Sequence, residues 1–352
     1  MKKLIKITSL IMAICLMLTL CACGGTSSDT QDSGSSSDTQ SSADNASAES
    51  SGMQSGEAKV IGVNQYGEHP SLDNCYNGFV QGLIDAGLEE GVDFTIEYQT
   101  AGFDDNLAGQ IAQSYSANDV DLMCAIATNS ATACYAAAED KNIPVIFTAI
   151  SDPEQANLVG SNITGTSDKL PVDAQLELIR ALQPDAETIG IIYTTSEPNS
   201  VSTISDYEEK VADYGFTLET VGITSQSEVT LAVDTLINRG VDCFSNLTDN
   251  TVVGVLGSVL EKTNEAGIPV YGSEITQVTA GCVASAGIDY FELGRRTGEM
   301  AAQILTGEAT ADDIPYETIT EYEIYVNSAA LEEMNIELSD EIAEDAIEAT
   351  EE

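Results

Sequence analysis

The chain has 352 residues, of which 58 are acidic and only 12 are basic, and its formal net charge at pH 7 is −46. A protein this acidic repels nucleic acids and anionic lipids, so polyanion-binding functions are excluded and neutral, zwitterionic or cationic ligands are favoured. One histidine and eight cysteines without a CxxC pair argue against a zinc site.

Residues 1–22 have the pattern of a secretory signal peptide: three lysines, a short apolar run and a small-residue end. The stretch Leu20-Cys21-Ala22-Cys23 resembles a bacterial lipobox, in which the cysteine after a small residue is lipidated and begins the mature chain; Cys23 fits this position. An uncleaved N-terminal helix is the alternative. In both cases we expect an exported chain, held at the extracytoplasmic face of a cell membrane.

Both ends of the remaining chain are polar. Residues 23–58 contain almost no apolar side chains beyond alanine, so we expect a disordered tether that spans roughly 30–35 Å from the lipidated Cys23 to a folded body. Residues 338–352 are interpreted as an acidic tail without an assigned function.

From residue 59 the chain alternates apolar runs with amphipathic segments. Apolar residues between 72 and 84 recur every three or four positions, which predicts a helix closed by Gly87. The apolar runs predict strands of parallel sheets covered on both faces, at 59–66, 93–100, 120–128, 143–150, 189–195, 217–223, 241–248, 268–274 and 282–289. A body of about 280 residues favours two α/β domains.

Three matches between the halves support two similarly folded lobes. Ile-Gly at 61–62 and at 189–190 begins a strand, and a proline follows at the same distance in both. The segment 120–130 matches 241–251 and places Asn129 on Asn250, while 142–149 matches 267–274 and places Thr148 on Ser273.

Ligands of open parallel sheets bind outside the carboxyl ends of the strands, so two facing lobes would enclose a ligand there. The candidate ligand-binding residues occupy six loops of this kind: Gln65, Tyr66, Glu68, His69 and Ser71; Thr128 and Asn129; Thr148, Ala149 and Asp152; Glu197, Asn199 and Ser200; Thr248, Asn250 and Thr251; Ser273 and Glu274. For any single Ser, Thr or Asn, helix capping alone is the competing explanation.

The motifs QYGEHPSLD, FTAISDP, GTSDKLPVDAQLELI, IGIIYTTSEPNS, TDNTVV and GIDYFELGRRTGEMAAQIL together resemble the ABC-transporter substrate-binding lipoproteins that include tryptophan- and tyrosine-binding members. The resemblance covers about residues 59–337. It implies the type I periplasmic-binding-protein fold, an α/β fold of two Rossmann-like lobes with parallel sheets joined by a three-strand hinge. It also implies a monomer without a cofactor that captures a small solute by hinge closure and delivers it to an ABC permease and its ATPase.

By this resemblance, lobe one comprises residues 59–167 and 289–314, and lobe two comprises 168–288 and 315–337. The chain would leave lobe one near residues 165–170, re-enter it at the hinge residue Asp289, and return to lobe two near Pro315.

By the same resemblance, an aromatic amino acid is the best candidate cargo. Its carboxylate would need donors, which Asn199-Ser200 and Asn250-Thr251 offer, and its ammonium would need a carboxylate, for which Asp152 and Glu274 are candidates with Glu68 behind them. Alternation along the strands must turn some of the candidate aromatic residues for a ring slot into the core: Tyr66, Phe147, Tyr193 and Tyr271.

His69 is expected to line the cleft as a hydrogen-bonding or stacking residue, with a structural role in its loop as the alternative. A nucleoside or another small solute, and a receptor that signals its occupancy, remain alternative functions. An exported enzyme is least favoured, because the chain has no GxSxG, HExxH, P-loop or GxGxxG motif. Cys124 and Cys243 lie in predicted strands and are expected to be small buried side chains, while disulfides among the five cysteines of the body remain possible.

Overall fold

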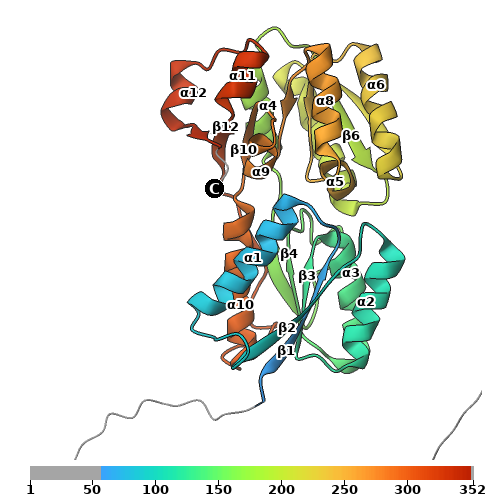
Figure 1. Cartoon of the computed structure of the whole chain (residues 1–352), viewed down its shortest axis with the longest axis vertical. Coiled ribbons are helices and arrows are strands. Elements are labelled where there is room, and N and C mark those ends of the chain that lie inside the picture. The colour runs from blue at the N-terminus through green and yellow to red at the C-terminus, as the bar shows by residue number, and fades with distance from the viewer. Residues whose placement is uncertain (1–56, 350–352) are drawn as a thin grey trace, which may run out of the picture. The chain divides into compact units, whose positions relative to one another are not determined.

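The computed structural model describes residues 57–349, so the signal peptide, Cys23 and nearly all of the 23–58 tether lie outside the described residues. The described chain forms two α/β lobes, drawn below and above in Figure 1. The mixed α/β architecture with parallel strands that the sequence predicts is confirmed.

Lobe one is built on a parallel six-stranded sheet in the order β11-β5-β4-β3-β1-β2. Its strands are β1 (Lys59–Gln65), β2 (Phe94–Thr100), β3 (Leu122–Ile126), β4 (Val145–Thr148), β5 (Ile163–Ser167) and β11 (Glu317–Thr318). Its helices are α1 (Pro70–Asp85), α2 (Asp105–Ala117), α3 (Thr128–Ala138), the short η1 (Glu139–Lys141) and α10 (Tyr290–Leu305).

Lobe two contains a parallel sheet in the order β7-β6-β8-β9 and a second sheet in the order β10-β12-β13. Its strands are β6 (Thr188–Thr194), β7 (Thr217–Ile223), β8 (Cys243–Ser245), β9 (Val270–Tyr271), β10 (Ala284–Gly287), β12 (Glu323–Val326) and β13 (Ile347–Glu348). Its helices are α4 (Val172–Leu182), α5 (Pro198–Lys210), η2 (Val211–Tyr214), η3 (Gln226–Glu228), α6 (Val229–Arg239), α7 (Asn250–Val253), α8 (Leu256–Ala266), α9 (Ile275–Thr279), α11 (Ser328–Glu333) and α12 (Asp340–Asp345).

The two lobes share a strand order, β2-β1-β3-β4 in one and β7-β6-β8-β9 in the other, as the internal sequence matches predict. Each of the nine apolar runs contains a strand. The sequence missed β5, because ITGTS has no apolar run. Thr166 of β5 is nevertheless buried, and its hydroxyl lies 3.1 Å from that of Thr148 and 2.8 Å from that of Thr297.

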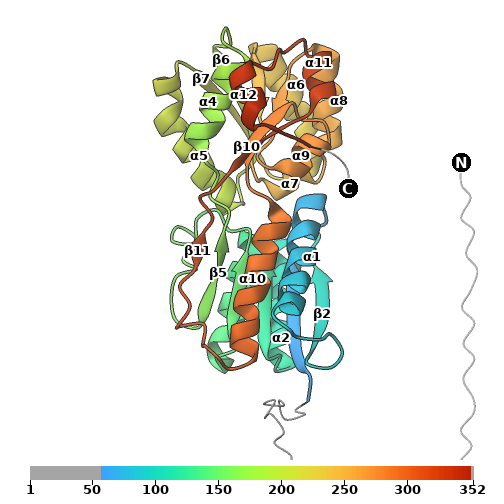
Figure 2. The ribbon, with the colours of Figure 1, turned by 90° about the vertical axis from the view of Figure 1, so that its left-hand side faces the viewer.

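Three segments connect the lobes: 168–171 after β5, 288–289 between β10 and α10, and 319–322 between β11 and β12 (Figure 2). Asp289 lies in the second of them and caps α10, where its carboxylate accepts hydrogen bonds from the backbone N–H groups of Phe291 and Glu292 at 2.8 and 3.2 Å. The expected return to lobe two near Pro315 needs correction. Because β11 pairs with β5 and Ile319 packs against the lobe-one core, the chain stays with lobe one until about Ile319.

The interpretation of residues 338–352 as a separate acidic tail is also wrong for the described part, 338–349. There α12 buries Ile342 in the lobe-two core, and β13 pairs in parallel with β12. Ala349 is likewise buried. A few apolar residues, such as Ile342, are therefore enough to pack this acidic segment against lobe two.

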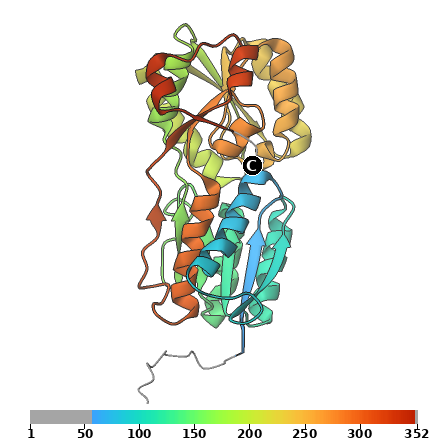
Figure 3. The same cartoon turned by 60° about the vertical axis from the view of Figure 1, so that its left-hand side comes forward.

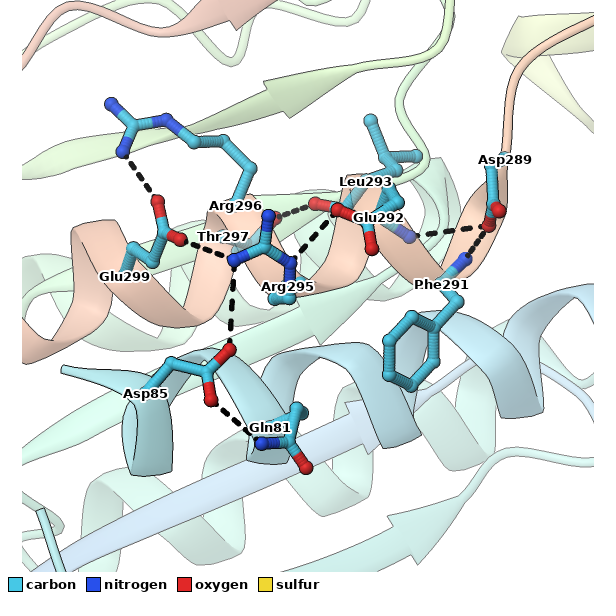
Figure 4. Close-up of polar contacts among 10 residues, drawn as sticks. All are labelled: Gln81, Asp85, Asp289, Phe291, Glu292, Leu293, Arg295, Arg296, Thr297 and Glu299. Atoms are coloured by element: carbon cyan, nitrogen blue, oxygen red, sulfur yellow. Dashed lines mark hydrogen bonds and ion pairs between the residues drawn. The ribbon is translucent and has the colours of Figure 1, made fainter. Parts of the chain in front are cut away.

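Helices α1 and α10 lie side by side on lobe one (Figure 3) and approach at glycines. A Cβ added at Gly78 would lie 2.0 Å from the carbonyl oxygen of Phe291, and one added at Gly294 would lie 2.1 Å from that of Cys75. Polar contacts flank this contact line: Arg295 of α10 pairs with Glu299 at 2.8 Å and reaches Asp85 of α1 at 3.5 Å (Figure 4).

The five cysteines of the described body, Cys75, Cys124, Cys134, Cys243 and Cys282, are all buried and free. They therefore act as small core side chains, which the sequence predicts for Cys124 and Cys243. Within residues 57–349, no helix combines the length and the apolar character that a membrane span requires.

Candidate functional site

The loops after the strands of both lobes meet across a buried boundary. Side chains from the two lobes contact each other directly there: His69 Nε2 and Asn250 Oδ1 lie 3.3 Å apart, the Ser71 hydroxyl donates to Glu274 at 2.9 Å, and the Ser202 hydroxyl donates to Asp152 at 3.0 Å. The cavity left between them has a volume of about 10 Å³, which is room for about one water molecule. The lobes are thus closed on each other.

Six candidate residues line this cavity, namely His69, Ser71, Ala149, Thr248, Asn250 and Glu274. Five residues that were not among the candidates complete it: Leu72, Asp168, Val253, Gln277 and Tyr290. The cavity therefore combines polar groups from both lobes with Asp168 of the first connecting segment and Tyr290, which directly follows the second.

Asp168 is a buried carboxyl group at the start of the first connecting segment. It accepts hydrogen bonds from the hydroxyl of Tyr290, the first residue of α10, and from that of Ser151 at 3.0 Å. Burial raises the pKa of Asp168, and these donors partly oppose the rise. Because its partners are neutral, Asp168 brings acceptor capacity without a compensating positive charge.

Glu274 is the second buried carboxyl group of the cavity and caps α9. It accepts hydrogen bonds from the backbone N–H groups of Thr276 and Gln277 at 2.7 and 2.9 Å, besides the one from Ser71. Burial raises its pKa as well. Its carboxylate thus joins lobe two to the start of α1 in lobe one.

Glu197 accepts hydrogen bonds from Asn250 and Thr251, the donors that were assigned from the sequence to a ligand carboxylate. Its two oxygens accept hydrogen bonds at 2.7–2.9 Å from the backbone N–H groups and side chains of Asn250 and Thr251. Burial and the nearby carboxylate of Asp249 raise the pKa of Glu197 to about 8. The Asn250-Thr251 donors therefore serve a carboxylate of the protein itself.

His69 is 6% exposed and begins α1 without capping it. Burial lowers the pKa of His69 to about 4. Its ring is stacked nearly parallel to that of Phe103, with an interplanar angle of 5° and 6.4 Å between the ring centroids. Phe103 also makes an edge contact with Tyr66. Phe103 lies close to glycines of both lobes, since a Cβ at Gly67 or Gly254 would approach its ring within 2.0 or 2.9 Å.

Tyr66 and Asn129 form a polar contact around Asp105 at the edge of the boundary. Asp105 accepts hydrogen bonds from the Tyr66 hydroxyl at 2.9 Å and from Asn129 Nδ2 at 2.7 Å. The same amide reaches the carbonyl oxygen of Ser196 in lobe two at 3.3 Å.

The other candidates lie beside the cavity or away from it. Gln65 holds its own loop through Gly67 and Asp73, Thr148 bonds to Thr166 inside lobe one, and Ser273 bonds to Gln277. Asn199 and Ser200 bond to Thr248 and Asp249 within lobe two, the Thr128 hydroxyl is buried without a partner among the described residues, and Glu68 is exposed. Asp152 both caps its turn through the Gln155 N–H and binds Ser202.

Two of the candidate aromatic residues are wrong for a ring slot. Phe147 and Tyr271 are fully buried in the cores of lobe one and lobe two. Tyr193 packs against the lobe-two core, whereas Tyr66 lies at the boundary through its contacts with Phe103 and Asn129.

The residues that sequence reasoning missed carry the same signal as those it found. Asp168 directly follows β5, and Phe103 follows β2, so both lie beyond the carboxyl end of a strand of the parallel sheet. Asp168 was overlooked because β5 itself was not recognised.

Comparison with known proteins agrees with this geometry. The family model described as ABC transporter substrate binding protein matches residues 60–350. The tyrosine-binding protein of Clostridioides difficile (strain R20291) is 39% identical over 292 residues, which cover 80% of this chain and 83% of that protein.

Solved structures give the same result. An ABC domain from Streptococcus pneumonia in complex with L-Trp is 32% identical with a TM-score of 0.79, covering 83% of this chain and 99% of that one. A ligand-free, open substrate-binding protein with adhesive properties from Clostridium difficile is 36% identical with a TM-score of 0.62, covering 84% and 100%. The chain thus belongs to the ABC transporter substrate-binding protein family and has the type I periplasmic-binding-protein fold.

Proposed function

We propose that this substrate-binding protein captures an aromatic amino acid, such as tyrosine, tryptophan or phenylalanine, between its lobes. The family consists of solute-binding proteins rather than enzymes. The observation that carries the proposal is the buried boundary where polar groups of both lobes meet around Asp168 and Glu274. A relative named as tyrosine-binding and a neighbour in complex with L-Trp favour this cargo over nucleosides and sugars.

The proposal places the ammonium group of the amino acid at the end of the site that is lined by Asp168 and Glu274. Both carboxyl groups are buried beside the same cavity, which suits a small cationic group. Asp152, the other candidate, lies at the half-buried edge and is bonded to Ser202. For the ring, Phe103 and Tyr66 are the aromatic side chains at the boundary.

Capture would proceed by closure of the lobes about the three connecting segments. The structure resembles the L-Trp complex more than the ligand-free open relative, with TM-scores of 0.79 and 0.62, although the open relative has the higher sequence identity. The higher TM-score with the L-Trp complex favours a closed state in the present structure. A cargo would then enter an open state and be enclosed as the lobes close, in a cavity larger than the space for one water molecule that the boundary leaves here.

We further propose that the protein is a monomeric lipoprotein on the extracytoplasmic face of the membrane. The signal-like residues 1–22, Cys23 and the polar tether that follows support an anchor of this kind. From there the protein would deliver its cargo to an ABC permease and its ATPase.

A thermal-shift screen of the folded body, from residue 57 onward, tests the cargo. The twenty amino acids, nucleosides and common sugars are each added at high concentration. A ligand at 100 times its dissociation constant stabilises the fold by about 2.7 kcal/mol, or roughly 4 °C for a body of this size. We expect this rise with aromatic amino acids. A rise only with nucleosides or sugars would contradict the cargo and retain the receptor.

A further inference from the structure

The orientation of one amide group determines which ring nitrogen of His69 carries the proton. Glu197 Oε2 accepts hydrogen bonds from the backbone N–H of Asn250 at 2.9 Å and from its Nδ2 at 2.7 Å. The amide nitrogen of Asn250 therefore faces this carboxylate, and its Oδ1 lies 3.3 Å from His69 Nε2 in the other lobe. Because an amide oxygen only accepts, His69 must carry its proton on Nε2.

This arrangement does not depend on the charge of Glu197. Its other oxygen, Oε1, lies 2.7 Å from the hydroxyl of Thr251. A hydroxyl can accept as well as donate, so a proton on Oε1 can be donated to Thr251 while Oε2 keeps both hydrogen bonds from Asn250. The amide orientation is then the same in both charge states of Glu197.

His69 consequently presents Nδ1 as an acceptor. This atom is buried and has no hydrogen-bond partner among the described residues. The lowered pKa of about 4 keeps the ring neutral near pH 7. A buried acceptor without a partner costs free energy, which a ligand donor would recover.

Several other acceptors at this boundary have no cationic partner, or no partner at all, among the described residues. Asp168 and Glu274 line the same cavity, and none of the ion pairs in the described part of the chain includes either of them. At the same boundary, Asn199 Oδ1 and Asn129 Oδ1 are buried acceptors without a partner among residues 57–349. These acceptors would suit a ligand that donates hydrogen bonds.

We propose that His69 recognises the cargo as a neutral hydrogen-bond acceptor, in a tautomer fixed by Asn250 and Glu197, and so selects solutes that present an ammonium or N–H donor beside Asp168 and Glu274. This inference rests on the proposed function and specifies its chemistry. His69 contacts the ligand, whereas Asn250 and Glu197 are positioning residues that act through it.

The tautomer can be measured directly, because His69 is the only histidine of the chain. NMR of the purified protein with ¹⁵N-labelled histidine distinguishes a protonated from an unprotonated ring nitrogen. We expect a protonated Nε2 and an unprotonated Nδ1 at neutral pH with saturating L-tyrosine, because the contact of His69 with Asn250 forms only when the lobes are closed. A proton on Nδ1, or on both nitrogens, would overturn the inference.

Variants separate this positioning from a general effect of lobe contacts. Asn250→Ala removes the acceptor from Nε2 and is expected to give a mixture of the two neutral tautomers. Asn74→Ala is the matched control, since it removes another amide contact between the lobes, from Asn74 Nδ2 to the Thr276 hydroxyl at 3.5 Å. We expect the control to retain the wild-type tautomer; a mixture in both variants would contradict a specific role of Asn250.

Ligand binding tests the recognised donor. His69→Phe is expected to weaken binding of L-tyrosine about tenfold to a hundredfold, because a hydrogen bond to a charged group is lost. Binding of deaminated tyrosine, which lacks the amine, should be weak in the wild type and nearly unchanged in the variant. Equal losses for the two ligands would overturn recognition of the amine by His69.

The two proposals can fail separately. If no aromatic amino acid shifts the ¹⁵N signals, the cargo assignment fails, and the tautomer measured with the ligand that the thermal-shift screen identifies decides how His69 is positioned. If L-tyrosine binds but Nδ1 carries the proton, the cargo assignment is supported and the proposed role of His69 as an acceptor is wrong.

Discussion

Four carboxyl groups, Asp168, Glu197, Asp249 and Glu274, are buried at or beside the lobe boundary. Their hydrogen-bond donors are backbone N–H groups, hydroxyls and amides, and burial raises the pKa of each. For Glu197 the neighbouring carboxylate of Asp249 adds to this effect. Folding of this region should therefore be accompanied by proton uptake.

The pKa of Glu197 defines the pH range in which this proton uptake affects stability. Its pKa is about 8 in the folded protein and 4.5 ordinarily, so the folded state binds more protons between these values. The free energy of unfolding should then rise as the pH falls from about 9 to about 7, by at least about 1 kcal/mol. Below about pH 6.5 the lowered pKa of His69 opposes the trend, because the unfolded state then binds the extra proton.

Thermal unfolding at several pH values measures the effect. In Glu197→Gln the rise toward pH 7 should be smaller than in the wild type, because the titrating group is absent. Glu187→Gln, which changes an exposed glutamate of the same lobe, should retain the full rise. Equal pH profiles for all three proteins would show that Glu197 does not take up the proton.

At the residue scale, the sequence predicted which loops meet at the lobe boundary better than which side chains contact each other there. The strand-end rule correctly placed His69, Asn250 and Glu274 at one boundary. It could not reveal that Glu197 satisfies the donors of Asn250, because that depends on how two loops pack. Nor could it tell that Phe147 faces the core, since both faces of a buried strand are apolar.

At the element scale, the contact between α1 and α10 depends on the absence of side chains. Gly78 and Gly82 of α1 face backbone carbonyl groups of α10, and Gly294 and Gly298 of α10 face those of α1. Since α10 follows the second connecting segment, this contact holds a returning part of the chain against the first helix of lobe one.

Gly78→Ala should therefore destabilise the protein by about 1–3 kcal/mol, which is typical of an overpacked interior. The new Cβ would lie 2.0 Å from the carbonyl oxygen of Phe291, so the helices must separate. Gly109→Ala in α2 is the matched control, because a Cβ there meets no atom within 4 Å. It should stabilise the protein by about 0.5–1 kcal/mol through helix propensity. Urea unfolding of both variants gives the sign of each change, and equal shifts would contradict close packing.

Elements with apolar runs were predictable, and those held by tertiary contacts were not. The strands β1 and β6 share the Ile-Gly start that revealed the repeat. By contrast, β11 and β13 each have only two residues, and pairing with β5 and β12 defines them. For this reason the resemblance to the family placed the last lobe crossing too early, and the sequence pattern separated α12 from lobe two.

At the scale of the whole molecule, binding and lobe closure should be coupled, because the boundary proposed to bind the cargo is also the contact between the lobes. Contacts at its edge, such as that of Ser202 with Asp152, join the lobes without lining the cavity. A ligand that binds the closed state better shifts the equilibrium toward it, and weakening an edge contact shifts the equilibrium back.

Ser202→Ala tests this coupling, because it removes a hydroxyl of α5 that donates to Asp152 at 3.0 Å across the boundary. Loss of about 1 kcal/mol from the closed state should weaken L-tyrosine binding roughly fivefold, mainly through faster dissociation. Ser205→Ala is the control on the same helix, since its hydroxyl bonds only to the Val201 carbonyl oxygen. Stopped-flow dissociation measures both variants. An unchanged rate in Ser202→Ala would mean that this contact does not contribute to closure, whereas equal acceleration in both variants would indicate a disturbed α5.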